Sequence, residues 1–443
     1  MTETESATPE LRRELSLLDS TMINIGTMIA SAIFIVPASI ALHAQSSLLV
    51  VLVWVVGGII SLLGALSVAE LGAAMPEAGG QYVYLREAYG PAWGFLYGWT
   101  AFTVINTASI SAIAVGFASY LGYFVKLDAA GIKAVAILSI ILLTVINCFG
   151  IKLGAWVLNG FTFIKLAALV ALVACSFILP GGSPENFSPL LPNQSFSGML
   201  GPLGLAMVAA LWAYDGWIEI TYVAGEVKNP QRNLPLSIIY SMLVVIVIYV
   251  VVNLAYTYVL SVGRMASSPL VGWDVATIII GSAGAALMTI GILISTLGAN
   301  HGIVFTAARI PYAMSKARLF FKSMAHVHPR FRTPTTALIV QGIWGCVLAM
   351  TGSYDQLFTY VVFASWVFYA MSCGAVIILR RSSPQMQRPY KTWGYPVTPI
   401  VFILFSIWLV ANTIIEAPRD AAIGAGIILI GLPVYFYWKK KKK

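Results

Sequence analysis

Charged side chains are scarce in this sequence. Asp, Glu, Lys and Arg make up 10% of its 443 residues, whereas soluble domains carry about 25%. Hydrophobic residues make up 59%. This balance excludes a soluble globular domain and places the chain in a lipid bilayer.

Cysteine and histidine are also few, and neither type is clustered. The four histidines are too scattered to form a metal site, and we expect neither a metal nor a cofactor. They are His43, His301, His326 and His328. The cysteines lie in or at the ends of apolar stretches, so we expect free thiols and no external disulfide framework. They are Cys148, Cys175, Cys346 and Cys373.

Motifs of nucleotide-driven pumps and of membrane hydrolases are absent. The sequence contains no P-loop, which argues against ATP-driven pumping by this chain. It contains no HExxH or GxSxG motif either. We therefore expect a protein that is not an enzyme.

What the sequence has in abundance is long apolar runs. A membrane-spanning helix takes ~20 apolar residues, and twelve such stretches are present. We expect an all-α polytopic membrane protein with twelve transmembrane helices at 17–43, 48–75, 93–124, 132–149, 157–179, 200–225, 236–262, 275–308, 335–350, 354–379, 396–414 and 421–438.

The distribution of basic residues predicts the orientation. The N-terminus is polar and acidic, without the short apolar core of a cleavable signal peptide, so we expect the first span to stay in the mature protein. Counted from a cytoplasmic N-terminus, 21 of the 26 Lys and Arg fall in inside segments. This predicts a multi-pass plasma-membrane protein with both termini cytoplasmic. The net charge of +9 then reflects orientation and attraction to anionic lipid headgroups, and we expect no nucleic acid partner.

Two apolar spans are interrupted in their middle. Gly26-Thr27 and Ala30-Ser31-Ala32 interrupt the first, and Tyr214-Asp215-Gly216-Trp217 interrupts the sixth. Interrupted spans at corresponding places in two halves of a chain point to a transporter's substrate site. Because five spans is an odd number, the second set of five must be inverted relative to the first.

The predicted organisation follows from these two halves. It comprises a cytoplasmic segment (1–16), a first repeat of helices 1–5 (17–179), an extracellular loop (180–199), a second repeat of helices 6–10 (200–379), helices 11 and 12 (380–438) and a cytoplasmic Lys tail (439–443).

A helix that breaks inside a membrane exposes amide and carbonyl groups, which protein or a water-filled cavity must satisfy. A zwitterion suits such a break, because its carboxylate binds amides at the start of a half helix and its ammonium binds freed carbonyls. On this argument Thr27 to Ala32 form the anion site and Trp212 to Asp215 the cation site. A simple kink at small residues is the competing interpretation.

Lys165 is a basic residue far from either end of its span. A charge at mid-membrane costs at least about 2.5 to 3.5 kcal/mol on insertion scales, so it faces the bundle interior and has a partner. That partner is either a carboxylate or the carbonyls of a broken helix. The functional interpretation is a fixed cation where a coupling ion would otherwise bind, and the two interpretations overlap.

Three carboxylates lie in or near apolar spans. Asp215 either meets a substrate ammonium or caps a half helix, and the sequence leaves both open. Glu219 and Glu70 are interpreted as structural. The inside segment from Ser315 to Thr333 mixes basic, aromatic and aliphatic residues, which predicts a short amphipathic helix on the membrane surface.

Four stretches resemble the L-type amino acid transporters of the amino acid, polyamine and organocation superfamily. Bacterial serine/threonine and alanine/serine/cysteine exchangers look most similar, and the resemblance covers essentially the whole chain. The stretches are Ile25 to Phe34; Ala69-Glu70-Leu71 through Pro76 to Tyr84; Trp212 to Trp217 through Glu226 to Pro235; and Arg309 to Met314 with His326 to Pro329 and Thr333-Pro334.

The resemblance implies a five-plus-five inverted repeat with discontinuous helices 1 and 6, and sodium-independent exchange of neutral amino acids by alternating access. By position, the substrate carboxylate would meet the amides of Ala30, Ser31 and Ala32. The ammonium would meet the carbonyls of Met28, Trp212 and Asp215, with the Trp212 ring as a gate. Lys165 would bridge the first span toward the eighth in place of sodium. The candidate substrate-binding residues are Thr27, Met28, Ala30, Ser31, Ala32, Trp212, Ala213 and Asp215.

Two departures from the family pattern refine this expectation. The usual Gly-Ser-Gly of the first span is Ala30-Ser31-Ala32 here, and the added methyl groups favour small substrates such as alanine, serine, cysteine, threonine or glycine. The outer loop from Lys126 to Gly131 lacks the cysteine that links animal relatives to a single-span glycoprotein. We expect no such covalent partner. The alternative function is a proton-coupled symporter of amino acids or polyamines, with Asp215 or Glu219 carrying the proton.

Overall fold

The computed structural model describes residues 10–192, 196–351, 354–416 and 418–442. Within those ranges it consists of helices and connecting segments, without a β-strand. Residues 1–9 of the predicted cytoplasmic segment, 193–195 of the predicted loop and 443 of the predicted tail lie outside the described residues.

The predicted all-α fold with twelve spans is confirmed. Among the described residues, nine helices are each long and apolar enough to cross a membrane, and one bent pair makes a tenth. Two shorter apolar helices, α9 (Phe196–Ala213) and α15 (Thr335–Thr351), complete the twelve.

The first five spans include the bent pair. They are α1 with α2 (Leu17–Met28, Ala32–Ala44), α3 (Ser47–Ala74), α5 with η1 and α6 (Pro91–Thr100, Ala101–Ile105, Asn106–Leu121), α7 (Ala129–Cys148) and α8 (Ile151–Ile178).

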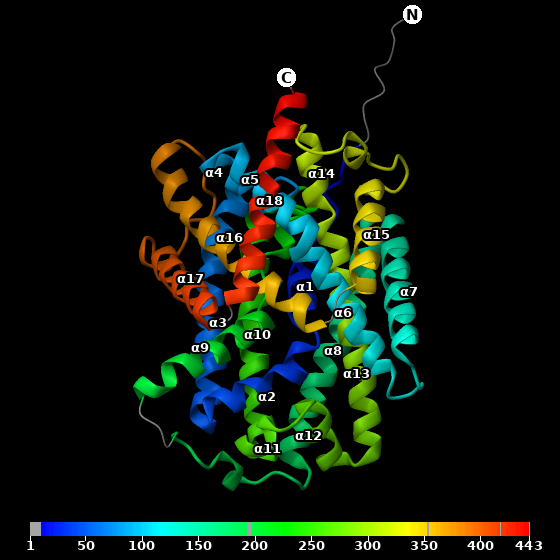
Figure 1. Cartoon of the computed structure of the whole chain (residues 1–443), viewed down its shortest axis with the longest axis vertical. Coiled ribbons are helices and arrows are strands. Elements are labelled where there is room, and N and C mark those ends of the chain that lie inside the picture. Colours follow the sequence, from blue (N-terminus) through cyan, green and yellow to red (C-terminus); the bar gives the residue numbers. More distant parts are fainter. Residues whose placement is uncertain (1–9, 193–195, 352–353, 417, 443) are drawn as a thin grey trace, which may run out of the picture.

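The next seven spans begin with α9, which enters from the opposite end to α1, as an odd number of preceding spans requires (Figure 1). After α9 come two short 3-10 turns, η3 (Glu219–Thr221) and η4 (Ala224–Glu226). The remaining spans are α10 (Pro230–Val259), α13 (Ser282–Ala307), α15, α16 (Tyr354–Ser382), α17 (Val397–Glu416) and α18 (Pro418–Lys442).

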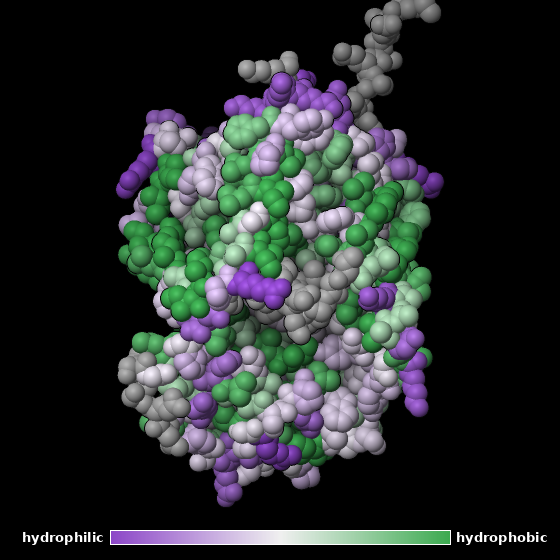
Figure 2. Space-filling model, viewed as in Figure 1, coloured by the Kyte–Doolittle hydropathy of each residue, from purple (hydrophilic) through white to green (hydrophobic). Residues whose placement is uncertain are grey.

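Short helices lie at both ends of the bundle. The chain enters α1 and leaves α18 at one end, together with α4 (Gln81–Tyr89) and α14 (Arg309–Lys316), whereas α11 (Val262–Ala266) and α12 (Val271–Ile280) lie at the other (Figure 1). We call these the cytoplasmic and the outer end, after the orientation that the distribution of basic residues predicts. Hydrophobic side chains cover much of the flanks, and hydrophilic ones gather at the cytoplasmic end (Figure 2).

Two of the sequence-based boundaries are wrong. The predicted eighth span, 275–308, merges α12 with α13, which separate at Gly281, where φ is +73°. An apolar run cannot reveal this turn, because residues on both sides of it are hydrophobic. The predicted amphipathic helix within Ser315 to Thr333 is instead a single 3-10 turn, η5 (Lys322–Ala325).

Local sequence explains where α1 begins. The Ser16 hydroxyl accepts the amide of Asp19, and the Asp19 carboxylate accepts the amide of Ser16, which is a capping box. From Met22 to Met28 every residue is buried, because α1 lies against α8, α10 and α13. A helix buried on all sides places its broken end in the middle of the bundle.

The third span contains a π-helical segment, η1, between α5 and α6. In a π-helix the hydrogen bonds span five residues instead of four. The amide of Asn106 accordingly bonds to the carbonyl of Ala101, five residues earlier. The Thr107 hydroxyl likewise donates to the carbonyl of Phe102 at 2.8 Å. This segment directly precedes the part of α6 that faces the centre of the bundle.

The cytoplasmic end is closed around a buried ion pair. Arg309 Nε lies 2.7 Å from Glu226 Oε1, and both side chains are fully buried. The amide of Leu15 donates to the carbonyl of Glu226 at 3.0 Å. The amide of Lys228 donates to the carbonyl of Leu15 at 2.8 Å. The segment before α1, the end of the sixth span and α14 are thereby joined.

We predict that Arg309→Met destabilises the protein by about 3–5 kcal/mol, because it leaves Glu226 buried without a cation. The double variant Arg309→Met/Glu226→Met should regain most of that loss. The measurement is the thermal unfolding midpoint of the detergent-solubilised protein.

The control is Arg86→Met, because Arg86 pairs with the partly exposed Glu87 at 2.8 Å. Its effect should stay below about 1 kcal/mol. Equal shifts for Arg309→Met and Arg86→Met would contradict the role given to the buried pair.

Candidate functional site

The first span breaks between Met28 and Ala32, where α1 and α2 meet at 46°. Small residues at this point remove side-chain bulk from the bend. The first amides of α2 have no partner within their own helix, as at any helix start. The amide of Ala30 bonds back to the carbonyl of Met28 at 3.0 Å. The free donors at the break therefore belong to Ser31 and Ala32 rather than to all three residues of the predicted set.

Lys165 on α8 satisfies the carbonyl end of this break. Its ammonium, in a side chain that is 1% exposed, donates to the carbonyl oxygens of Gly26 at 2.8 Å and Ile29 at 2.6 Å. It also lies 3.2 Å from the carbonyl of Ser295 on α13. The Ser295 hydroxyl lies 3.1 Å from the carbonyl of Ile29 and 3.2 Å from that of Ala30. Of the two partners that the sequence left open, Lys165 thus has main-chain carbonyls, and it connects the first span to the eighth.

The sixth span breaks after Ala213 and does not resume as an α-helix. Gly216 has a φ of +111°, a conformation that side chains with a Cβ rarely adopt. A Cβ at this position would lie 3.0 Å from the amide nitrogen of Met28 and from the Thr27 hydroxyl. The Thr27 hydroxyl also lies 3.2 Å from the carbonyl of Gly216. The two breaks therefore touch each other, and glycine allows the contact.

Tyr249 on α10 forms hydrogen bonds with both breaks. Its hydroxyl lies 2.8 Å from the carbonyl of Met28 and 2.9 Å from that of Ala213. Sequence reasoning missed this residue. The available signal was a tyrosine in the middle of an apolar span, since a buried hydroxyl needs a hydrogen-bond partner.

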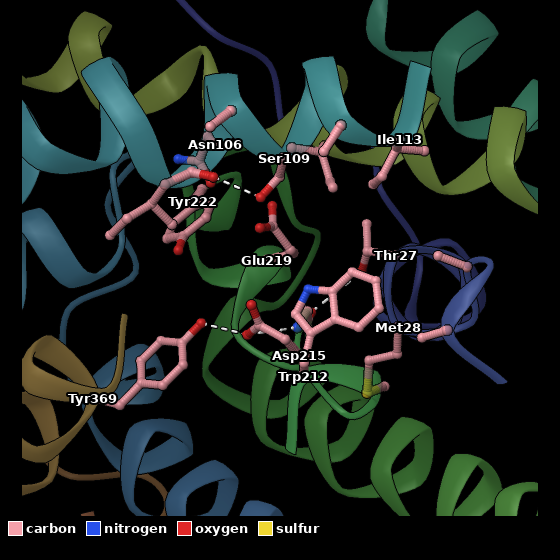
Figure 3. A pocket seen from close by; sticks show the side chains of 17 residues that line it. Thr27, Met28, Asn106, Ser109, Ile113, Trp212, Asp215, Glu219, Tyr222 and Tyr369 are labelled. Atoms are coloured by element: carbon pink, nitrogen blue, oxygen red, sulfur yellow. Dashed lines mark hydrogen bonds between the residues drawn. The ribbon is translucent and has the colours of Figure 1, made fainter. Parts of the chain in front are cut away.

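A cavity of about 60 Å³ lies between the two breaks and α6, α13 and α16. In Figure 3 the Trp212 ring lies between Thr27 and Met28 on one side and Asp215 on the other. Six of the predicted residues line the cavity: Thr27, Met28, Ala30, Ala32, Trp212 and Asp215. The predicted Ser31 and Ala213 are buried outside the lining, and Lys165 lies behind the first break.

Other polar side chains complete the lining, and sequence reasoning did not single out most of them. They are Asn106 and Ser109 on α6, Tyr222 after η3, and Tyr369 on α16, together with Glu219 of η3, which the sequence assigned a structural role. The residues on α6 and α16 belong to spans in which the sequence showed no interruption, so no motif marked them. Tyr222 belongs to the interrupted sixth span but lies beyond its interrupting residues.

The two carboxylates of the cavity differ in their contacts. Asp215 Oδ1 accepts the Tyr369 hydroxyl at 2.5 Å and the amide of Gly216 at 3.0 Å (Figure 3). These are capping contacts at the break, and they leave Oδ2 facing the cavity. Glu219 accepts the hydroxyl of Thr306 and, within the described residues, forms no ion pair.

Glu70 is remote from the cavity, as its structural interpretation requires. It pairs with Arg380 at 2.6 Å and Arg388 at 3.4 Å near the cytoplasmic end. Nearer the cavity, the Tyr97 hydroxyl donates to that of Tyr222 at 2.8 Å.

Comparison with known proteins identifies relatives along the whole chain. A family model described as amino acid permease matches residues 15–437. The serine/threonine exchanger of Bacillus subtilis (strain 168) is 34% identical over 440 residues, which cover 98% of each chain. The b(0,+)-type amino acid transporter 1 of Homo sapiens is 32% identical over 98% of this chain and 89% of its own. The human cystine/glutamate transporter is 30% identical over 98% of this chain and 87% of its own.

We predict that Lys165→Ala destabilises the protein by about 2–4 kcal/mol, because the carbonyls at the first break lose a charged donor in a buried place. The measurement is again the thermal unfolding midpoint in detergent.

Lys133→Ala is the matched control, since Lys133 is exposed and donates to a single carbonyl, that of Met350, at 2.9 Å. It should change the midpoint little. If both lysine variants shift the midpoint equally, Lys165 does not hold the break.

Proposed function

This chain belongs to the amino acid permease family, and on that basis we propose that it is a sodium-independent exchanger of small neutral L-amino acids that works by alternating access. The observation that carries the proposal is the contact of two broken spans at one polar cavity. Family and relatives are transporters, which agrees with the expectation that the chain is not an enzyme. The Bacillus subtilis relative is named an exchanger.

Both charged ends of an amino acid have partners in this cavity. The substrate carboxylate binds the amides of Ser31 and Ala32, at the positive end of α2. The ammonium binds Asp215 Oδ2 and the carbonyl of Trp212, which also accepts the amide of Asp215 at 3.0 Å. The carbonyl of Met28 is a weaker candidate than the family pattern implies, because it already receives Tyr249 and the amide of Ala30.

The position of Lys165 supports the proposal of sodium independence. Sodium binds main-chain and hydroxyl oxygens, as other hard cations do. At the first break such oxygens already surround the Lys165 ammonium, which lies within 3.2 Å of three carbonyls. A fixed positive charge there repels a second cation, so no sodium site is needed to hold the break.

The methyl groups of Ala30 and Ala32 support the assignment to small substrates. Both residues line the cavity, whose volume is about 60 Å³. We also propose that the chain acts in the plasma membrane with both termini cytoplasmic. It acts without a covalent single-span partner, because the four cysteines lie in helices α7, α8, α15 and α16.

One observation favours a second candidate, a proton-coupled symporter. Glu219 lines the cavity and has a hydroxyl partner in place of a cation. A carboxyl group in such a place can carry a proton together with the substrate.

We predict obligatory exchange. Liposomes that contain the purified protein and labelled alanine or serine should release label when unlabelled amino acid is outside, and release little into empty buffer. Replacing sodium with choline should leave the rate unchanged. Equal release into empty buffer would refute the exchange.

Two controls sharpen this experiment. Gly216→Ala should abolish exchange because its Cβ meets the first break, whereas Gly160→Ala on α8, where a Cβ meets nothing within 4 Å, should retain it. An imposed pH gradient should not drive accumulation. If it does, and Glu219→Gln abolishes that accumulation, the symporter is correct.

We predict that Ala30→Gly/Ala32→Gly admits larger side chains. Removing methyl-sized bulk should raise exchange of leucine relative to alanine by about tenfold or more, measured by counterflow. Ala38→Gly, on α2 outside the cavity, should leave this ratio unchanged. An unchanged ratio in the double variant would show that these methyl groups do not limit substrate size.

A further inference from the structure

A second polar cavity lies at the cytoplasmic end, between the segment that follows α14 and the last turns of α18. Its volume is about 630 Å³. The two segments that form it are more than a hundred residues apart in the sequence. Its lining residues are Arg318, Phe320, Phe321, Lys322, Trp438 and Lys441.

The charge of this cavity is entirely positive. Arg318, Lys322 and Lys441 are exposed, and the lining contains no acidic residue. Within the part of the chain that the structure describes, none of the three pairs with a carboxylate. Three cations that converge without an anion repel one another, so the cavity is suited to a group with several anionic oxygens.

Aromatic rings line the cavity beside these cations. The Phe321 and Trp438 rings meet edge to face at 5.0 Å, and Phe320 contacts Phe321 at 5.2 Å. Lys441 Nζ lies 5.5 Å from the centre of the Trp438 ring. Aromatic residues of this kind gather where the hydrocarbon of a membrane gives way to headgroups.

The surface below the cavity is apolar. Exposed hydrophobic side chains on α18 extend from it toward the outer end, and they are Leu429, Ile430, Phe436 and Tyr437. In Figure 2 the hydrophilic cytoplasmic end borders directly on hydrophobic surface. A ligand that fills the cavity therefore has an anionic head at the level of Trp438 and an apolar part that continues along α18.

We propose that this cavity binds the phosphate headgroup of an anionic phospholipid of the cytoplasmic leaflet, with the acyl chains lying along α18. Phe320 connects the site to the transport core, since its ring contacts Phe102 of η1 at 5.6 Å. The proposal concerns binding and does not depend on which substrate the central cavity takes.

The test uses the full chain in mild detergent, with phosphatidylglycerol as the probe and phosphatidylcholine as the neutral comparison. Native mass spectrometry counts bound lipid, and the thermal midpoint reports stabilisation. Wild-type protein should retain phosphatidylglycerol in preference to phosphatidylcholine. Arg318→Gln/Lys322→Gln/Lys441→Gln should bind it about tenfold to a hundredfold more weakly, since each basic residue contributes separately.

A charge-matched control separates this site from general attraction to a basic surface. Lys152→Gln/Lys228→Gln/Lys391→Gln removes three exposed cations of the cytoplasmic end outside the cavity, and it should bind phosphatidylglycerol as wild type does. Equal weakening in both triple variants would overturn the proposal.

Glycerol 3-phosphate distinguishes a lipid from a soluble phosphate. It carries the anionic head without acyl chains, so it should stabilise the protein far less than phosphatidylglycerol at the same concentration. If it stabilises the protein equally, the cavity binds free phosphate compounds and the lipid assignment is wrong. Trp438→Ala should reduce lipid retention while all three cations remain.

Discussion

The central constraint on this structure is that peptide groups released from a helix inside a membrane must find other partners. Water is not at hand in the hydrocarbon layer, and each orphaned group costs several kcal/mol. The first break is satisfied from α8 by Lys165 and from α13 by Ser295. The second is tied to the first through Tyr249 and Thr27. We propose that the remaining amides of α2, one oxygen of Asp215 and the carbonyl of Trp212 bind the substrate.

The two sides of the breaks have different roles: one side is held by protein side chains, and the other side faces the cavity. On the side toward α8 and α10, Lys165 and Tyr249 donate to the freed carbonyls and so restrain the unwound backbone. The side toward α6 and α16 is an open cavity lined by polar side chains. At the cytoplasmic end the buried pair of Arg309 and Glu226 joins three segments of the chain. Movement of that end must therefore carry a paired charge rather than expose a single one.

The sequence predicted the parts of this design that have a compositional signal. Twelve apolar runs predicted the spans. Small and polar residues within two of them predicted the breaks, because small residues permit a bend and polar residues are costly at mid-membrane. Lys165 stood out for the same reason. The hydrogen-bond partners of Tyr249, Ser295 and Tyr369 were not predictable, because hydrophobic periodicity says nothing about which distant carbonyl or carboxylate a side chain reaches. Gly281 was missed because glycine is common in membrane helices and only the backbone angle reveals a turn.

The π-helical segment η1 has a consequence for how α6 presents its side chains. A π turn accommodates one residue more than an α turn, and one residue corresponds to about 100° of rotation around a helix axis. The side chains of α6, which begins after Ile105, are therefore rotated by about 100° around the helix axis compared with a continuous α-helix from α5. The extra residue of the π turn thus directs Asn106 and Ser109 into the cavity. Loss of one residue between Ala101 and Ile105 would leave the length of the span almost unchanged, yet it would aim a different stripe of α6 at the centre.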